Sequence, residues 1–214
     1  MIASLIASIV IGTNSVSFTA TATGVAKETP VEFMFVGKGS DRDYEAMFIL
    51  DEPIAALADA LEKSGIPRGC PTDLSVCRLW SVGVPLTLSP ALDDYVERQP
   101  IEGESYPPIV YTGGARADDG KPMAEKEMPQ AVLALFDCAQ SILHYDGILP
   151  QGVVYGKQLA RQELKKGDRR TFKLAWDGRN RVRSINLEIT PGNLAQAIRR
   201  LRDESASGPL DVTV

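Results

Sequence analysis

FMFVGKGSDRDYEAMFILDEP, from Phe33 to Pro53, and FKLAWDGRNRVRSINLEITP, from Phe172 to Pro191, are two stretches that follow one pattern. In each, an apolar strand-like run leads into a polar turn that contains glycine. A second apolar run follows, and a proline opens a segment with helical periodicity. A glycine-containing break and another apolar run then close each copy. This similarity predicts two ββαβ units that form an internal repeat.

The fold class predicted from this repeat is α+β. Each unit is expected to place its helix on one face of an antiparallel-rich sheet, and a β-rich segment is expected between the units. The 214 residues are enough to enclose a hydrophobic core. Within one compact domain, the predicted parts are an apolar N-terminal segment (residues 1–12), a first unit (13–90), a β-rich middle segment (91–156) and a second unit (157–214).

In the first unit, alternating apolar residues from Val16 to Ala22 predict a strand. A helix is expected to begin at Pro53, where a missing N–H group costs nothing, and to end at Gly65 with a left-handed cap. Its expected inner stripe is Ile54, Leu57, Ala58 and Leu61, and the side chains expected to face water are Asp59, Glu62 and Lys63.

In the second unit, the dipeptide Asp177-Gly178 predicts the turn of a hairpin between residues 171–176 and 181–189. A second helix is expected after the proline that follows. Two other segments stay open, because residues 131–136 fit a buried strand or a short helix, and residues 157–170 fit a short helix or a strand.

The first twelve residues, MIASLIASIVIG, are apolar but too short to span a bilayer. They are similar to the hydrophobic part of an export signal, and Ala20-Thr21-Ala22 is a small-x-small cleavage pattern. However, no Lys or Arg precedes the run, and the cleavage pattern lies within alternating strand residues. We therefore expect a weak or truncated signal that ends near Gly12, with the first strand of the mature protein beginning near Asn14. The alternative is that Ile2–Ile11 is a buried strand or helix of a cytoplasmic protein.

Cysteine usage adds one expected crosslink. Cys70 and Cys77 flank a short loop in GCPTDLSVC and can form a disulfide in an oxidising compartment if the loop folds back. Cys138, in the apolar run AVLALFDCA, is expected to be a buried thiol. Because His144 is the single histidine, the chain has little from which to build a zinc site. No metal or other cofactor is expected.

The net charge of −5 conceals an asymmetry along the chain. Residues 1–156 carry 10 Lys and Arg against 21 Asp and Glu, whereas residues 157–214 carry 13 against 7. Either an anionic partner or packing of the two oppositely charged parts against each other explains this distribution, and we expect the packing.

Arg179, Arg181 and Arg183 are the candidate surface for an anionic partner, because alternate strand residues share a face. The expected partner is an acidic protein surface or the acidic part of this chain. A sequence pI near 5.0 and the lack of a recognisable motif argue against nucleic acid. Peripheral membrane association stays open, and the sequence does not predict an oligomeric state.

The stretch VEFMFVGKGSDRDYEAMFILDEPIAALADALEKSGIPRG resembles the YdjY-domain family, whose members are largely predicted to be exported. A second patch, Val110-Tyr111-Thr112-Gly113 followed by Asp119-Gly120, is similar to a strand in that family that ends before a polar loop. Members often carry His where this chain has Tyr44, so a histidine-dependent role is not expected. The likeness covers residues 30–145 in patches and implies export and a fold, because the family has no established activity. The matching residues of the first stretch are Glu32, Phe33, Tyr44, Glu45, Leu50, Asp51, Pro53, Ala60, Leu61 and Gly65.

Asp43, Tyr44 and Glu45 belong to the strongest polar constellation, and their carboxylates could bind a cation or act as acid and base. Tyr111 is the other candidate ligand-binding residue. The alternative is a solvated turn whose Arg and Asp pair locally. We therefore expect a non-enzymatic, exported or envelope-associated module that binds a protein or a surface. The second hypothesis is an enzyme or small-ligand binder with its site near Asp43, Glu45 and Tyr111.

Overall fold

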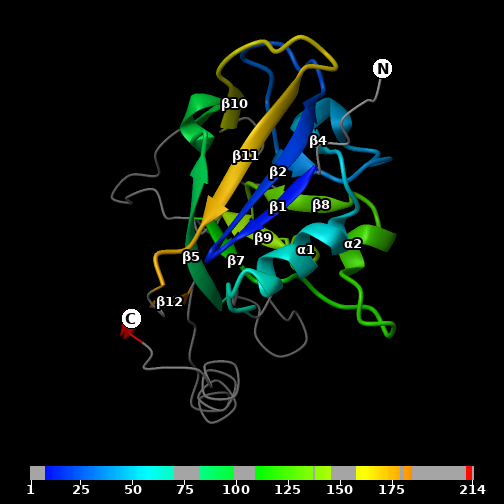
Figure 1. Ribbon diagram of the computed structural model, residues 1–214. Helices are drawn as coiled ribbons and strands as arrows, with labels where there is room; N and C mark the ends of the chain where they lie inside the picture. Colours follow the sequence, from blue (N-terminus) through cyan, green and yellow to red (C-terminus); the bar gives the residue numbers. More distant parts are fainter. Residues whose placement is uncertain are drawn as a thin grey trace, which may run out of the picture.

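The computed structural model describes residues 8–69, 82–98, 109–136, 138–145, 158–178, 181–184 and 211–213. Strands dominate, most neighbouring strands run antiparallel, and the predicted α+β class is confirmed (Figure 1). The helical elements are η1 (Asp43–Glu45), α1 (Ile54–Lys63), η2 (Leu92–Asp94) and α2 (Met123–Lys126). The strands are β1 (Ile9–Gly12), β2 (Ser15–Ala22), β3 (Phe33–Val36), β4 (Ala46–Leu50), β5 (Val82–Ser89), β6 (Val96–Arg98), β7 (Ile109–Tyr111), β8 (Ala131–Ala134), β9 (Leu143–Tyr145), β10 (Gln158–Ala160), β11 (Arg169–Ala175), β12 (Arg181–Ser184) and β13 (Asp211–Thr213).

β2 pairs with three other strands. Every second side chain from Val16 to Ala22 is buried, which confirms the strand predicted from the alternation. β11 pairs along one edge of β2, while β1 and β4 share the other edge, β1 beside its first half and β4 beside its second half. Proteolytic cleavage after Ala22 would therefore remove a strand that holds three others.

β11 closes the sheet into a barrel. The order of paired strands is β2-β4-β3-β8-β9-β7-β5, and β11 pairs with both β2 and β5. These eight strands form a closed ring, to which β1 is attached at β2 and β12 at β5 (Figure 1). The expected open sheet with helices on one face is replaced by a barrel, because one long strand joins its two ends.

Two pairs of neighbouring strands run parallel. β3 and β4 form one pair and β8 and β9 form the other, and β3 is antiparallel to β8 between them. Residues 37–45, which include η1, therefore cross between parallel strands and do not form a hairpin turn. The strand order β2-β4-β3 recurs as β7-β9-β8, with the third strand of each group inserted between the first two. This topological repeat differs from the repeat predicted from sequence.

The hairpin predicted at Asp177-Gly178 is wrong for the described residues. β11 and β12 both pair antiparallel with β5, where Ala175 lies opposite Thr87 and Arg183 lies opposite Gly83. The chain therefore continues along β5 and does not fold back on itself. The helix expected after Pro191 lies outside the described residues, so the ββαβ repeat stays a prediction.

The predicted first helix is confirmed as α1. It follows Pro53, and its expected inner stripe is buried against the barrel core. Gly65 has a φ of +94°, which is the left-handed cap expected there. The two open segments are also settled, because residues 131–134 form the buried strand β8 and residues 158–160 form the strand β10.

Aromatic rings fill the interior of the barrel. Phe172 on β11 contacts four other buried rings, and centroid distances range from 4.8 Å to Phe35 to 5.8 Å to Phe18. The other two rings are Phe48 on β4 and Tyr95 after η2, which also contact each other edge to face. Five segments that are distant in sequence therefore meet at one side chain.

Replacement of Phe172 by Ala should lower the free energy of unfolding by about 3–5 kcal/mol, because the cavity would lie among four rings that cannot collapse onto it. Urea denaturation measures the change. Phe136→Ala is the matched control, since Phe136 is also buried but contacts Phe33 edge to face in a small separate cluster. An equal loss in the two variants would contradict the central role of Phe172. If Phe172→Ala does not fold, Phe172→Leu replaces it in the same comparison, and a smaller loss in the free energy of unfolding is expected.

Candidate functional site

Two of the three predicted residues of η1, Tyr44 and Glu45, contact Arg42, whereas Asp43 is exposed. Glu45 is 6% exposed, and Arg42 Nη1 lies 3.0 Å from its Oε1. The same Nη1 donates to the hydroxyl of Tyr44 at 2.8 Å, and Arg42 Nε lies 3.7 Å from a carboxylate oxygen of Asp41. Local pairing, the alternative considered from sequence, is therefore present here, although on a crossover and not in a hairpin.

Glu32 is a residue of this cluster that the sequence did not single out as a site. Burial raises its pKa above the ordinary value, the carboxylate of Glu45 raises it further, and Arg42 opposes the change. Glu32 comes next to the cluster because its N–H donates to the C=O of Glu45 at 2.9 Å. The guanidinium of Arg42 lies near the carboxylates of Asp41 and Glu45, and it balances one of the negative charges of the cluster.

Tyr111 belongs to a different network. It is fully buried on β7, and its hydroxyl donates to Glu62 Oε1 on α1 at 2.9 Å. Burial, together with the carboxylate of Glu62, raises the pKa of Tyr111 far above its usual range, so the hydroxyl stays protonated. Arg116 Nη2 lies 2.7 Å from the same Glu62 oxygen. The three side chains attach α1 to the barrel, and Glu62 has this role although it was expected only to face water.

The contacts of Tyr111 do not include the residues around η1. Its hydrogen bonds run to α1, whereas those of Glu45 run to Arg42. The site that was predicted from Asp43, Glu45 and Tyr111 together is therefore two networks with separate partners. Glu62 and Arg116 could not be identified from the sequence, because Glu62 reaches Tyr111 only when α1 packs against the barrel and Arg116 joins the network through Glu62.

The structure describes only some of the other predicted site residues. Cys70, Cys77 and Arg179 lie outside the described residues, and Arg181 and Arg183 are described only as backbone of β12. Cys138, expected to be buried, is half-buried beside the cluster containing Phe33 and Phe136.

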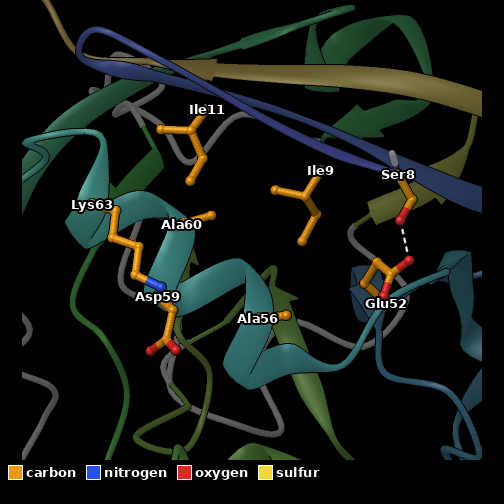
Figure 2. A pocket seen from close by; sticks show the side chains of 8 residues that line it. All are labelled: Ser8, Ile9, Ile11, Glu52, Ala56, Asp59, Ala60 and Lys63. Carbon is orange, nitrogen blue, oxygen red and sulfur yellow. Dashed lines mark hydrogen bonds between the residues drawn. The ribbon is translucent and has the colours of Figure 1, made fainter. Parts of the chain in front are cut away.

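A groove of about 420 Å³ lies between β1 and α1 (Figure 2). Its volume is within the range of small-molecule sites. Ile9 and Ile11 of β1 form one wall, and Ala56 and Ala60 of α1 lie opposite them. Small side chains on the helix leave the space between the two elements open. The remaining lining residues are Ser8, Glu52, Asp59 and Lys63.

The walls of the groove are tied together at both ends. At one end the hydroxyl of Ser8 donates to the carboxylate of Glu52 (Figure 2). At the other end the N–H of Asn14, in the turn after β1, donates to the C=O of Ser64 at 2.9 Å. The N-terminus of α1 is held as well, since Glu125 accepts from the N–H of Ala55 at 2.5 Å. The groove therefore has fixed dimensions.

β1 ends the order of paired strands in the described part of the chain, so its outer edge has no strand partner there. The N–H of Thr19 donates to the C=O of Ser8 at 3.0 Å, which sets the alternation of hydrogen bonds between β1 and β2. By this alternation Val10 and Gly12 bond to β2, whereas Ile9 and Ile11 direct their N–H and C=O groups away from it. The outward-directed groups belong to the residues that line the groove.

Metal and membrane chemistry gain no support from the described ranges. No group of three or more His, Cys, Asp and Glu residues is placed there to hold a metal ion. Among the same residues, no helix is both long enough and apolar enough to cross a membrane.

Comparison with known proteins gives no match among family models, curated proteins or solved structures. The resemblance to the YdjY-domain family therefore stays a prediction, and function must be argued from the site.

One ion pair joins the acidic and the basic parts of the chain. Arg169 Nη2 on β11 lies 2.7 Å from a carboxylate oxygen of Asp51. Burial alone would raise the pKa of Asp51, but hydrogen bonds from Thr21 and Arg169 outweigh it and hold the pKa below its usual range. This contact supports internal packing as an explanation of the charge asymmetry.

Replacement of Arg169 by Gln should reduce stability at pH 7 by at most about 1 kcal/mol, because the arginine is largely exposed. A lowered carboxyl pKa stabilises the fold above the unfolded value near 4, and this contribution disappears as the pH falls through the folded value. The difference from wild type should therefore diminish as the pH falls below about 4, as measured by urea denaturation across pH. Arg170→Gln is the control, since the ion pair that Arg170 forms among the described residues is with its neighbour Asp168. A pH-independent loss in Arg169→Gln would contradict the role of Asp51.

Proposed function

We propose that this protein is a non-enzymatic binding module that takes a segment of a protein partner into the groove between β1 and α1. The observation that carries the proposal is the outer edge of β1, which has no strand partner in the described part of the chain and lies beside a groove whose walls are joined by hydrogen bonds at both ends. Val10 and Ile11 add to it, because 56% and 47% of their surfaces are exposed on a strand with no charged residue. Natural edge strands usually carry charges or proline that discourage pairing, and this one carries neither.

The alternative, a catalytic or small-ligand site near Asp43, Glu45 and Tyr111, has weaker support. Arg42 pairs with the carboxylate of Glu45, and the hydroxyl of Tyr111 donates to Glu62 on α1. A general base needs an accessible proton acceptor with a pKa near the working pH, and a tyrosine that stays protonated does not supply one.

Location at the cell envelope remains part of the proposal, with one restriction. A signal cleaved near Gly12 would remove β1 and with it one wall of the groove. The binding function therefore requires that residues 8–12 remain in the mature protein, and the intact mass of protein purified from the native host tests this requirement.

A photo-crosslinking amino acid at Ala56, on the floor of the groove, should capture the partner in the native host. The same group at Lys173, on the exposed outer face of β11, is the matched control and should give no such product. Mass spectrometry identifies the captured protein. A second substitution, Ala60→Trp, should remove the Ala56 product because the indole would fill the groove.

Two results would contradict the proposal. One is capture of the same protein with equal yield from Lys173, and the other is an Ala56 product that survives Ala60→Trp. Circular dichroism of Ala60→Trp shows whether the variant keeps the wild-type fold. If it does not, Ala60→Met, which fills less of the groove, replaces it and should reduce the yield.

A further inference from the structure

We infer that the segment bound in the groove is a single extended strand with alternating apolar and small or basic side chains, which adds to the barrel sheet at the outer edge of β1. This inference rests on the proposed function and specifies its ligand. The chemical class is an extended peptide that is recognised chiefly through its backbone.

The backbone of β1 supplies the hydrogen-bonding pattern. Ile9 and Ile11 each present one N–H donor and one C=O acceptor away from β2, so two residues offer four groups at alternate positions of a strand. The strand Ile9–Gly12 has four residues, and at about 3.4 Å per residue it matches a short run of peptide. An added strand would satisfy these groups without any change in β2.

The helix restricts the side chains of the added strand. Alternate side chains of a strand point to opposite faces, so every second residue of the peptide would point toward α1. Ala56 and Ala60 lie opposite the side chains of Ile9 and Ile11, so the side chains that a strand at the edge of β1 directs into the groove share a volume of about 420 Å³. Small side chains are therefore expected at the positions that face the helix.

The charges of the lining favour a basic residue in the ligand. Glu52 and Asp59 contribute two carboxylates and Lys63 contributes one ammonium group, so the lining has one negative charge in excess. The whole chain is also acidic, with a net charge of −5. A lysine or arginine in the peptide has Asp59, which is exposed on the helix, as its carboxylate partner.

A second copy of this chain fits the edge less well. Two β1 strands paired about a two-fold axis would bring both copies of α1 to the same seam, because α1 runs along β1 beneath its lining side chains (Figure 2). A single bound peptide adds no second helix at this edge, so it avoids this crowding.

The test uses the full-length protein and the blocked peptide acetyl-Thr-Ala-Val-Ala-Val-Lys-Thr-amide. Amide hydrogen exchange followed by NMR should show that binding slows the N–H groups of Ile9 and Ile11. The N–H groups of Val10 and Gly12 should change little, since β2 already protects them. Replacement of the peptide lysine by glutamate should weaken binding about tenfold.

The variant Ile11→Pro removes one outward N–H and leaves the ladder to β2 intact, because proline is tolerated where the N–H faces solvent on an edge strand. It should weaken peptide binding about tenfold. Ile11→Ala keeps the N–H and trims the side chain, and it should weaken binding less than Ile11→Pro does. Circular dichroism verifies that both variants are folded. If Ile11→Pro does not fold, a peptide methylated at the backbone nitrogen of its central Ala-Val bond should bind at least tenfold less well.

Three results would overturn the inference. The first is no binding of the peptide at millimolar concentration, and the second is binding without protection of Ile9 and Ile11. The third is a dimer of the unliganded protein that Ile11→Pro dissociates, because the edge would then belong to a second copy. The proposed function fails separately, when the Ala56 crosslink is absent. An Ala56 crosslink that is unaffected by Ile11→Pro would preserve the function and reject the strand.

Discussion

The structure depends on the position of Phe172 on β11. Its ring contacts Phe18, Phe35, Phe48 and Tyr95, and its backbone lies in the strand that joins β2 to β5. Closure of the barrel and filling of its interior are therefore one event, because the strand that closes the ring also supplies the central ring of the core. Because the interior of the barrel is filled, exposed binding surfaces lie outside it, where β1 and α1 are attached.

The groove depends on this arrangement through α1. The inner stripe of α1 packs into the barrel core, and Tyr111, Glu62 and Arg116 hold its other side. A helix fixed in this way cannot collapse onto β1, so the space beside the strand stays open and no ordering of the wall is needed when a ligand enters. Rigid walls reduce the entropy cost of binding, which favours recognition of short segments.

Local features of the fold could be predicted from the sequence, and pairing partners could not. The strand from Val16 to Ala22, the helix after Pro53 and its glycine cap follow from periodicity and backbone preference. The parallel pairing of β3 with β4 and the continuation of β11 into β12 along β5 depend on strands distant in sequence. A turn dipeptide such as Asp177-Gly178 states where the chain can bend, and it does not state whether the flanking strands find each other or a third strand.

The candidate site was missed for a related reason. The four-residue strand Ile9–Gly12 has the composition of an export-signal core, and only its register with β2 reveals that Ile9 and Ile11 carry outward backbone groups. Asp43, Tyr44 and Glu45 were predicted as a site because charged residues can be identified from the sequence alone. The type of a residue does not show whether its backbone N–H and C=O groups lack a strand partner.

The closure of the ring by β11 also determines how the protein must fold on the ribosome. β2 is synthesised early, and the strand that covers its second edge emerges only after most of the described chain. Until then β2 and β5 both expose edges, and contacts of such large sequence separation form slowly. The nascent chain therefore passes through a period in which these strand edges can pair with a neighbouring chain.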